Sequence, residues 1–329
     1  MADKREKQQW VTPARSQRSY SAGSEFIANI PLQHIVNIGR LLGNLIFWAD
    51  VPHRRIVRRN LQFAYPDWSP GEIRKISKRI FQNLAITVLE IFQMSFLSCE
   101  DILVRIRARG QGHLTRALER NQGIILISAH LGNWEAALQF MSCFSQRPCT
   151  GVVKKIRFRP LNRWLNHLRT RFGLNVVNKK GALPKMRQAL RRGEVTGLLI
   201  DQSKRSESVD VHFYGKMVTA TPAAALLAFR CKSPVLPIFC VREADGQLAL
   251  RVDAPLDLKR TGDLRSDLIT NTQMMTDVIE KVIREHPDQW LWLHKRWKKH
   301  HPYLYPEYFA RRQRRKEREK KRAAAEKKF

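Results

Sequence analysis

A short aliphatic run that ends at a histidine constrains the fold of this chain more than any other feature of its sequence. Residues 124–127 are Ile-Ile-Leu-Ile, preceded by Gly123, which is typical of a strand buried on both faces. The run ends at His130, and residues 133–140 have the apolar spacing of a helix. The sequence therefore predicts a strand that passes into a helix, with His130 in the turn between them.

The same alternation of strand and helix patterns continues through most of the remaining chain. Short aliphatic and β-branched runs predict strands at residues 150–153, 174–177, 195–200, 235–241 and 248–252. Apolar residues at helical spacing predict helices at residues 111–121, 160–172, 184–192, 219–230 and 267–285. This order predicts an α/β domain over residues 101–305, with a central, mostly parallel mixed sheet flanked by helices. The Asp245–Gly246 pair predicts that the last two strands form a hairpin.

The first apolar segment, residues 26–51, has the length of a membrane span but not its uniform apolar character. Arg40 lies in its middle, and polar residues recur at steps of three and four to form one stripe. Trp48 lies near its end, and a cluster of arginines follows within residues 53–59. An apolar face, a boundary aromatic residue and a basic flank favour a helix inserted at a membrane surface. A core helix of a soluble domain and a single tilted span are the alternatives.

A second long helix is predicted to follow. Ser69, Pro70 and Glu72 form a capping box with proline at the first helical position, and helical apolar spacing continues to Leu97. Residues 26–100 are therefore predicted to form an N-terminal helical, membrane-associating region. Residues 1–25 are polar, carry charges of both signs and lack the pattern of a signal peptide, which predicts a disordered leader.

The chain is strongly basic, with 60 Lys and Arg against 29 Asp and Glu and a net charge of +31. Such a charge attracts polyanions, namely nucleic acid, anionic lipid headgroups or an acidic carrier protein. Lys and Arg dominate residues 306–329, which are predicted to form a solvated, partly helical basic tail. This tail suits electrostatic attachment to an anionic membrane surface.

The cysteines predict neither a metal site nor a disulfide framework. Their number is odd, and the sequence contains no C-x-x-C pair. Most lie in apolar surroundings, which favours reduced core thiols in a protein that faces the cytosol. The five are Cys99, Cys143, Cys149, Cys231 and Cys240.

His130 and Glu135 form the most specific pair of chemical groups in the sequence. A histidine with a nearby carboxylate can act as a general base whose ring the carboxylate orients. On one continuous helix a five-residue step turns by about 500°, so the two side chains would diverge by roughly 140°. The pair therefore meets only if His130 precedes the helix and Glu135 lies in its first turns. The alternative is a buried histidine that satisfies a helix end. Ser128 is interpreted as strand-end packing rather than as a nucleophile.

Four ordered blocks make the sequence resemble one family. Residues 130–135, His-Leu-Gly-Asn-Trp-Glu, resemble the His-x4-Asp/Glu signature of glycerolipid-type acyltransferases, in particular the bacterial lipid A late acyltransferases of the lauroyl and myristoyl type. Residues 54–66, with Arg-Arg-Asn-Leu and Tyr-Pro, are similar to the N-terminal block of that family. Residues 201–222, from Asp-Gln to Thr-Pro, and residues 289–298, with Trp-Leu-Trp-Leu-His-Lys-Arg-Trp, are similar to its later blocks. The resemblance extends over residues 38–302.

This resemblance implies a membrane-associated O-acyltransferase with a glycerolipid acyltransferase-like α/β domain. It implies transfer of a fatty acyl chain from acyl-acyl carrier protein to a hydroxyl group of a lipid A precursor, at the cytoplasmic face of the bacterial inner membrane. His130 would be the general base, since its unperturbed pKa of about 6.5 suits proton abstraction near neutral pH. Glu135 would hold one ring nitrogen and stabilise the imidazolium. Neither a cofactor nor a metal ion is implied.

The resemblance also implies a set of residues that bind substrate or stabilise the oxyanion. The backbone amides of the turn at Gly132 and Asn133 would donate to the oxyanion, assisted by Lys155 as the basic residue after the next strand. Asp201 and Gln202, at the tip of a later strand, would orient that cation or a substrate hydroxyl group. A helix cap is the alternative role of Asp201.

Two other functions are compatible with parts of the sequence. An acyl-CoA-dependent enzyme that acts on a glycolipid, as in the phosphatidylinositol mannoside acyltransferases, would keep the same fold and base. A nucleic-acid-binding protein would account for the basic charge and for the Trp- and Arg-rich residues 290–297. The sequence contains no recognised nucleic-acid-binding module and no stacking motif, so the lipid A acyltransferase is the leading hypothesis.

Overall fold

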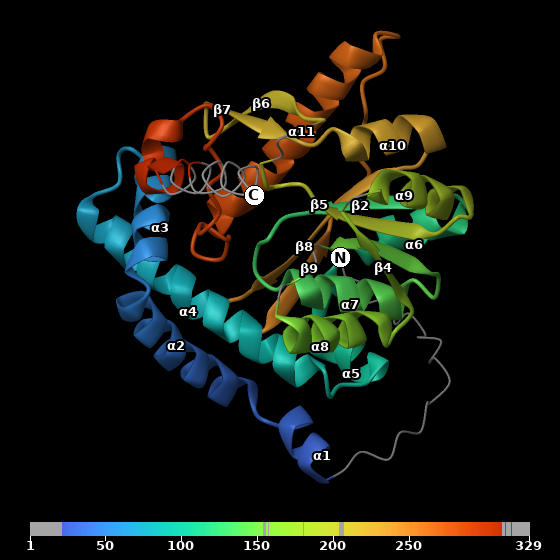
Figure 1. Ribbon diagram of the computed structural model, residues 1–329. Helices are drawn as coiled ribbons and strands as arrows, with labels where there is room; N and C mark the ends of the chain where they lie inside the picture. Colours follow the sequence, from blue (N-terminus) through green and yellow to red (C-terminus); the bar gives the residue numbers. More distant parts are fainter. Residues whose placement is uncertain are drawn as a thin grey trace, which may run out of the picture.

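A seven-stranded sheet forms the centre of the molecule (Figure 1). The computed structural model describes residues 22–153, 156, 158–179, 181–203, 207–310, 313 and 317. The strands are β1 (Arg107–Arg109), β2 (Ile124–Ser128), β3 (Cys149–Val153), β4 (Leu174–Asn178), β5 (Val195–Leu199), β6 (Val209–Phe213), β7 (Lys216–Ala220), β8 (Val235–Arg242) and β9 (Leu248–Val252). Within the described ranges the large sheet has the order β1-β9-β8-β2-β5-β3-β4, and β6 pairs with β7 in a separate hairpin.

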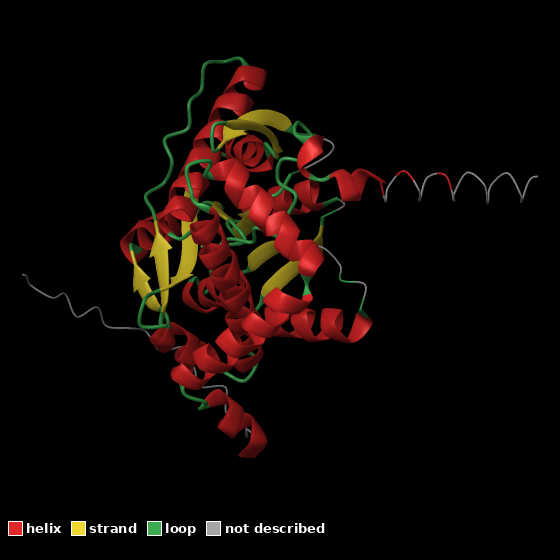
Figure 2. Cartoon of the chain, turned by 90° about the vertical axis from the view of Figure 1, so that its left-hand side faces the viewer, coloured by secondary structure: helices red, strands yellow, loops and turns green. Residues whose placement is uncertain are grey.

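Helices cover both faces of this sheet and extend beyond one edge of it (Figures 1 and 2). They are α1 (Ala22–Ala28), α2 (Leu32–Ala49), α3 (Val51–Ala64), α4 (Pro70–Met94), α5 (Cys99–Arg105), α6 (Gln111–Glu119), α7 (Trp134–Phe144), α8 (Arg159–Thr170), α9 (Ala182–Arg191), α10 (Ala223–Cys231) and α11 (Leu264–Glu285), with a 3-10 turn at Pro302–Leu304. Ile124 and Leu126 of β2 belong to one apolar core with α5, α6 and α7. Ile125 and Ile127 belong to a second core with α9, α10 and α11.

The central strand β2 is buried along its whole length, as its aliphatic run predicts. It pairs in parallel with β5 on one side and with β8 on the other. The strands β3, β4 and β5 also pair in parallel, whereas β8 and β9 form the predicted antiparallel hairpin. The predicted α/β class with a mostly parallel mixed sheet is therefore confirmed.

The apolar segment at residues 26–51 forms two helices rather than one, because Pro31 separates α1 from α2. α2 packs along α4, and Gly39 and Gly43 lie at the contact between them. A Cβ atom added at Gly43 would lie 2.3 Å from the Cα atom of Gln82, so glycine allows the two backbones to approach closely. Among the described residues, no helix combines the length and the apolar character needed to cross a membrane.

The predicted start of α4 is confirmed by its capping box. The N–H of Glu72 donates to the Ser69 hydroxyl at 3.3 Å, and the Glu72 carboxylate accepts the N–H of Ser69 at 2.8 Å. The helix ends at Met94 rather than at Leu97. The arginine-rich residues before α4 form the helix α3. In the sequence these residues were interpreted only as the basic flank of the first apolar segment. Residues 1–21 of the predicted leader lie outside the described residues, whereas residues 22–25 form the start of α1. Most of the tail at residues 306–329 also lies outside the described residues.

Residues 209–220 form an antiparallel hairpin, for which the sequence predicted no strands, and the predicted start of a helix at residue 219 falls within it. Tyr214 and Gly215 join β6 to β7 with φ angles of 54° and 66°, the positive values of a two-residue type I′ turn. Thr219, expected in a helix, lies in β7. The hairpin packs on α11, where Glu280 accepts a hydrogen bond from the N–H of Tyr214 at 2.5 Å.

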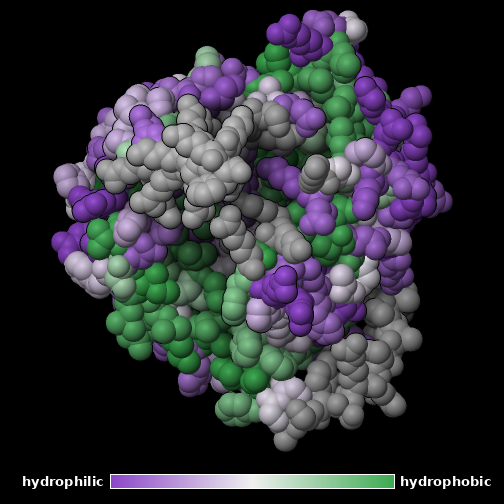
Figure 3. Space-filling view, viewed as in Figure 1, coloured by the Kyte–Doolittle hydropathy of each residue, from purple (hydrophilic) through white to green (hydrophobic). Residues whose placement is uncertain are grey.

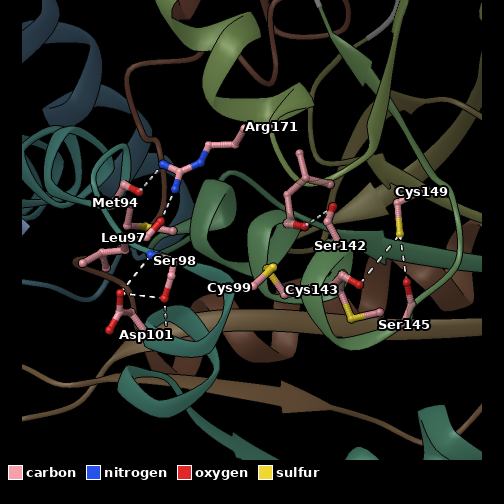
Figure 4. Close-up of a disulfide and its surroundings, with 12 residues drawn as sticks. Met94, Leu97, Ser98, Cys99, Asp101, Ser142, Cys143, Ser145, Cys149 and Arg171 are labelled. Carbon is pink, nitrogen blue, oxygen red and sulfur yellow. Dashed lines mark hydrogen bonds between the residues drawn. A yellow bond between two sulfur atoms is a disulfide. The ribbon is translucent and has the colours of Figure 1, made fainter. Parts of the chain in front are cut away.

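Cys99 and Cys143 form a disulfide bond, so the expectation of reduced thiols is wrong for this pair (Figure 4). Cys99 is the first residue of α5 and Cys143 lies in the last turn of α7, so the bond joins these two helices directly. Beside it, the guanidinium of Arg171 donates hydrogen bonds to the carbonyl oxygens of Met94 and Leu97, where α4 ends. The spacing of cysteines along the chain does not report which of them meet in space.

Removing the disulfide should lower stability without changing the fold. The bond closes a loop with a sequence separation of 44 residues. Loop closure of this size constrains the unfolded chain by about 4 kcal/mol. The double variant Cys99→Ser/Cys143→Ser should therefore denature at a lower urea concentration than the oxidised protein, as followed by circular dichroism. Adding a reductant should shift the wild type and leave the double variant unchanged, and equal midpoints for all samples would contradict the assignment.

Candidate active site

The candidate site lies beyond the carboxyl ends of two neighbouring parallel strands. β2 and β5 pair with Ser128 opposite Leu199, and the N–H of Ile200 donates to the carbonyl of Ser128 at 3.0 Å. His130 follows β2 and Asp201 follows β5, so the pairing of these strands brings together two residues that are 71 positions apart. In open α/β sheets, ligand sites form at this edge.

Asp201 is the carboxylate partner of His130. Its Oδ1 lies 2.8 Å from Nδ1 of His130, and its Oδ2 accepts the backbone N–H of His130 at 3.1 Å. The indole N–H of Trp290 donates to the same Oδ2 at 2.8 Å. The Asp201 side chain is 1% exposed, whereas the His130 side chain is 22% exposed and can be reached from solvent. This network assigns a hydrogen to Nδ1 of His130 and leaves Nε2 with a lone pair.

The electrostatics of the pair favour a charged carboxylate and an imidazole that accepts a proton readily. Burial disfavours the imidazolium, but the charge and the hydrogen bond of Asp201 outweigh burial and raise the pKa of His130 above its ordinary 6.5, with a smaller contribution from Glu135. Burial also opposes ionisation of Asp201. The charge of His130 and the hydrogen bonds from His130 and Trp290 nevertheless hold the pKa of Asp201 well below its usual range. The site therefore stabilises the positive charge that His130 gains when it takes up a proton.

Glu135 does not hold the ring of His130. It lies in the first turn of α7 and His130 precedes that helix, as predicted, but its carboxylate pairs with the guanidinium of Arg169 in α8. Nε of Arg169 donates to one carboxylate oxygen at 2.9 Å, and Nη2 donates to the other. The expectation that Glu135 holds the ring of His130 is therefore wrong. Asp201 occupies the position on Nδ1, because β5 lies next to β2.

The backbone amides expected to stabilise an oxyanion are already used within the protein. The N–H of Gly132 donates to the carbonyl of Gln289 at 3.0 Å, and the N–H of Asn133 donates to the carbonyl of Cys240 at 2.8 Å. Gly132 has a φ of 57°, and an added Cβ would lie 2.1 Å from the carbonyl oxygen of Cys240, so this position requires glycine. Both residues build the turn, and their N–H groups do not face a ligand, which corrects that expectation.

Lys155 and Gln202 are the other two residues expected to bind substrate, and of these the structure describes only Gln202. Lys155 lies outside the described residues, and its assignment stays a prediction. Gln202 follows Asp201, and its amide nitrogen is 3.4 Å from each ring nitrogen of His130, at the outer limit of a hydrogen bond. A group that approaches Nε2 of His130 therefore also meets the amide of Gln202.

The C-terminal block of residues 289–298 closes the site from one side. Trp290 forms an isolated β-bridge with Leu131, which brings its indole N–H to the carboxylate described above. The N–H of Leu291 donates to the carbonyl of His130 at 2.9 Å. These aromatic residues form one of the blocks that resemble the family, but the sequence predicted no role for Trp290 at the site. A buried tryptophan needs an acceptor for its indole N–H, and this requirement could have indicated that Trp290 bonds to a buried polar group such as Asp201.

A second histidine lies on the same side of the site. Nε2 of His294 accepts the N–H of Ser203 at 3.2 Å. Burial, with a further contribution from the charge of Lys298, lowers the pKa of His294 to about 3, so this ring is neutral at physiological pH. The carbonyls of His294 and Trp292 accept hydrogen bonds from the buried side chain of Asn60 at 2.9 and 2.6 Å. Asn60 belongs to the N-terminal block of residues 54–66, so the first and last blocks meet beside the site.

This arrangement can remove a proton from a hydroxyl group. His130 presents Nε2, and the buried Asp201 orients the ring and stabilises the imidazolium. Glu135 and Asp201 each have a positively charged or protonatable partner of their own, so neither carboxylate competes with His130 as the base.

Comparison with known proteins places these features in a family context. A family model described as bacterial lipid A biosynthesis acyltransferase matches residues 17–299, which include all four blocks. The lipid A biosynthesis lauroyltransferase of Escherichia coli (strain K12) is 27% identical over 276 residues, covering 83% of this chain and 88% of that protein. The lipid A biosynthesis myristoyltransferase of the same organism is 23% identical over 273 residues, covering 82% and 81%.

Two more distant matches were found. The phosphatidylinositol mannoside acyltransferase of Mycolicibacterium smegmatis is 25% identical over 189 residues, covering 56% of this chain and 60% of that protein. Among solved structures, the 1-acyl-sn-glycerophosphate acyltransferase PlsC of Thermotoga maritima aligns with 78% of this chain and 99% of that chain, at 14% identity and a TM-score of 0.35.

Replacing Asp201 should lower the pKa of His130. In the wild type the carboxylate raises that pKa above 6.5 against the effect of burial. In Asp201→Asn the charge is lost while burial remains, so the midpoint of the His130 titration should fall below about 6.5. Nuclear magnetic resonance of histidine-labelled protein measures the midpoint, with the signal assigned from His130→Gln. The control Asp277→Asn, in α11, should leave it unchanged, and an unchanged midpoint in Asp201→Asn would refute the role of this carboxylate.

Proposed function

The chain belongs to the bacterial lipid A biosynthesis acyltransferase family, and on that premise we propose that it transfers a fatty acyl chain from acyl-acyl carrier protein to a hydroxyl group of a lipid A precursor. One observation carries the proposal. His130 is paired with a buried, ionised Asp201 at the carboxyl ends of β2 and β5. This pair supplies the base that acyl transfer to a hydroxyl group requires.

The proposed reaction uses His130 for both proton transfers. The acceptor oxygen attacks the thioester carbonyl carbon while its proton moves to Nε2 of His130. The carbon–sulfur bond then breaks, and the departing thiolate takes the proton back from the imidazolium. Asp201 holds Nδ1 throughout and stabilises the charged ring. No acyl-enzyme is formed in this scheme, because the hydroxyl group attacks the donor directly.

Glu135 and Gln202 have supporting roles in this proposal. Glu135, paired with Arg169 in the last turn of α8, fixes the start of α7 relative to the end of α8. The amide of Gln202 lies beside the His130 ring and can donate a hydrogen bond to the thioester carbonyl oxygen as negative charge develops on it. Lys155 is kept as a candidate cation for the same oxygen.

The basic surface of the protein is evidence that its substrates are acidic. α8 exposes Arg159, Arg163 and His167 at steps of four on one face, on the same helix as Arg169, which reaches Glu135. An acyl carrier protein and a phosphorylated lipid A precursor are both acidic, and the net charge of +31 favours their approach. The match to the mannoside enzyme favours a second candidate, in which acyl-CoA is the donor and a glycolipid the acceptor.

An exposed apolar surface supports attachment to a membrane. Large apolar side chains of α2 and α4 point outward, and Figure 3 shows a continuous apolar region over these two helices. Leu41 is 61%, Leu45 59% and Trp48 57% exposed, and the arginine-rich α3 follows immediately. Apolar side chains beside basic ones suit insertion into an anionic lipid surface and do not suit nucleic acid. These features support the proposal that the enzyme acts at the cytoplasmic face of the bacterial inner membrane, with α2 lying in the interface.

Replacing His130 should abolish acyl transfer in a folded protein. The variant His130→Ala should lower kcat by roughly 100- to 10,000-fold, since it removes the base. The assay follows a radiolabelled acyl chain from acyl-acyl carrier protein into a lipid A precursor, with the donor acyl-CoA compared at equal concentration. We expect kcat/KM to be about ten-fold higher with the carrier protein, because the basic surface attracts the acidic carrier.

The matched control for this experiment is His113→Ala, which removes a histidine of α6 whose ring contacts Arg116 on the same helix, and it should retain full activity. Full activity in His130→Ala would refute the proposed base. Higher activity with acyl-CoA and a mannoside-type glycolipid would favour the second candidate function instead.

Polar substitutions on the apolar face of α2 should weaken membrane binding. Burying the half-exposed Leu41 and Leu45 contributes about 2 kcal/mol together. The variant Leu41→Ser/Leu45→Ser should therefore bind vesicles of phosphatidylglycerol and phosphatidylethanolamine roughly 30-fold more weakly in a flotation assay. Leu264→Ser/Ile269→Ser replaces exposed apolar residues of α11 and serves as the control that should bind normally. Equal binding of all three proteins would exclude α2 as the membrane contact.

A further inference from the structure

A buried ion pair lies behind the turn of residues 131–133, which we call the catalytic turn, and it has no part in the chemistry proposed above. Glu90, in α4, is 4% exposed, and Arg242, the last residue of β8, is 7% exposed. Nε of Arg242 donates to one carboxylate oxygen of Glu90 at 2.9 Å, and Nη2 donates to the other at 2.5 Å. Removing two charges from water is costly, and such a pair often adds nothing net to stability. Its presence therefore calls for an explanation other than stability.

Asn133 joins this ion pair to the catalytic turn. Its Nδ2 donates to Oε2 of Glu90 at 2.9 Å, and its Oδ1 accepts the N–H of Ala136 at 2.9 Å as the N-cap of α7. One amide side chain thus connects Glu90 to the first turn of the helix that carries Glu135. Asn133 is 0% exposed, so water does not compete for either contact.

The same two elements, α4 and β8, hold the rest of the catalytic turn. The hydroxyl of Thr87 in α4 donates to the carbonyl of Gly132 at 3.2 Å. On the other side, the backbone N–H and carbonyl of Arg242 both bond to the Gln289 side chain, at 2.8 and 2.7 Å. The carbonyl of Gln289 in turn accepts the N–H of Gly132 at 3.0 Å. Every member of the turn after Leu131 is therefore fixed from α4, β8 or the C-terminal block.

We propose that Glu90 is a positioning residue for acyl transfer. Held by Arg242, its carboxylate fixes Asn133, and Asn133 sets the direction in which His130 and the start of α7 face the substrates. The inference rests on the proposed function, because it assigns Glu90 to that reaction. Glu90 touches neither substrate nor reacting atoms and acts only through Asn133. A displacement of about 1 Å in a reacting group can cost roughly 100-fold in rate, so a loosened turn should lower kcat and leave KM unchanged.

Two single substitutions test the link from its two ends. Glu90→Gln keeps the shape of the side chain, but an NH2 donor replaces one of the two oxygens that accept from Arg242, and the negative charge is lost, so the oxygen that anchors Asn133 is held less firmly. Asn133→Ser keeps an oxygen that can cap α7 but is too short to reach Glu90 as well. Each should lower kcat by about ten-fold or more with KM for the acyl donor within about two-fold of the wild type. The double variant should be no slower than the slower single variant, since both changes break one link.

A matched substitution on the same helix separates positioning from general weakening of α4. Gln93 is also buried, and its Nε2 donates to the carbonyls of Ile27, Ala28 and Ile30, away from the catalytic turn. Gln93→Ala should lower the melting temperature and retain the wild-type kcat. If Gln93→Ala lowers kcat as much as Glu90→Gln does, or if Glu90→Gln and Asn133→Ser keep the wild-type kcat, the proposal is overturned. Independent, multiplying losses in the double variant would overturn it as well.

Hydrogen exchange gives a second readout that does not depend on activity. Amides of residues 131–140 should exchange faster in Glu90→Gln and in Asn133→Ser than in the wild type and in Gln93→Ala, as measured by mass spectrometry of that peptide. Should the wild type fail to transfer any acyl chain, the proposed function fails, and unchanged exchange in both variants would then refute the link on its own. This measurement also covers the case in which Glu90→Gln is too unstable to assay, because Asn133→Ser retains the ion pair.

Discussion

The hydrogen bond between His130 and Asp201 is the interaction on which the rest of the site depends. It exists because two parallel strands end side by side, so residues far apart in the chain emerge at one edge of the sheet. The carboxylate stays ionised in a buried position because three donors converge on it, two from His130 and one from Trp290. Without the C-terminal block the third donor would be lost, and burial would then oppose the charge with less compensation.

Three carboxylates surround the turn between β2 and α7, and each is paired with a different basic side chain. Asp201 meets His130, Glu135 meets Arg169, and Glu90 meets Arg242. An unpaired charge in these buried positions would be strongly destabilising. The basic partners come from the turn itself, from α8 and from β8, so pairing each carboxylate also fixes where those elements lie. Electrostatic compensation thus determines the position of the turn from several directions.

Local patterns in the sequence predicted β2, β3, β4, β5, β8 and β9, the capped start of α4 and both strand ends that carry His130 and Asp201, but not β1, β6 or β7. They did not predict that these ends are neighbours, because the lateral order of strands depends on contacts between distant segments. Glu135 was therefore assigned to the histidine that is closest in sequence, whereas it pairs with Arg169. The bond between Cys99 and Cys143 and the pairing of Glu90 with Arg242 escaped prediction for the same reason, since each joins residues from separate elements.

The strand order has one more consequence. Everything between the two members of the His130–Asp201 pair, namely α7, β3, α8, β4 and α9, is a single continuous excursion of the chain that leaves β2 and returns beside it as β5. Its outer part, β3 to β4, lies at the far edge of the sheet and includes the basic α8. Changes of sequence or length in β3 and β4 therefore need not move the base or its carboxylate, provided that Arg169 of α8 still meets Glu135. The two neighbouring strands that carry His130 and Asp201 thus form one unit of the sheet, and the outermost strand β4 lies apart from it.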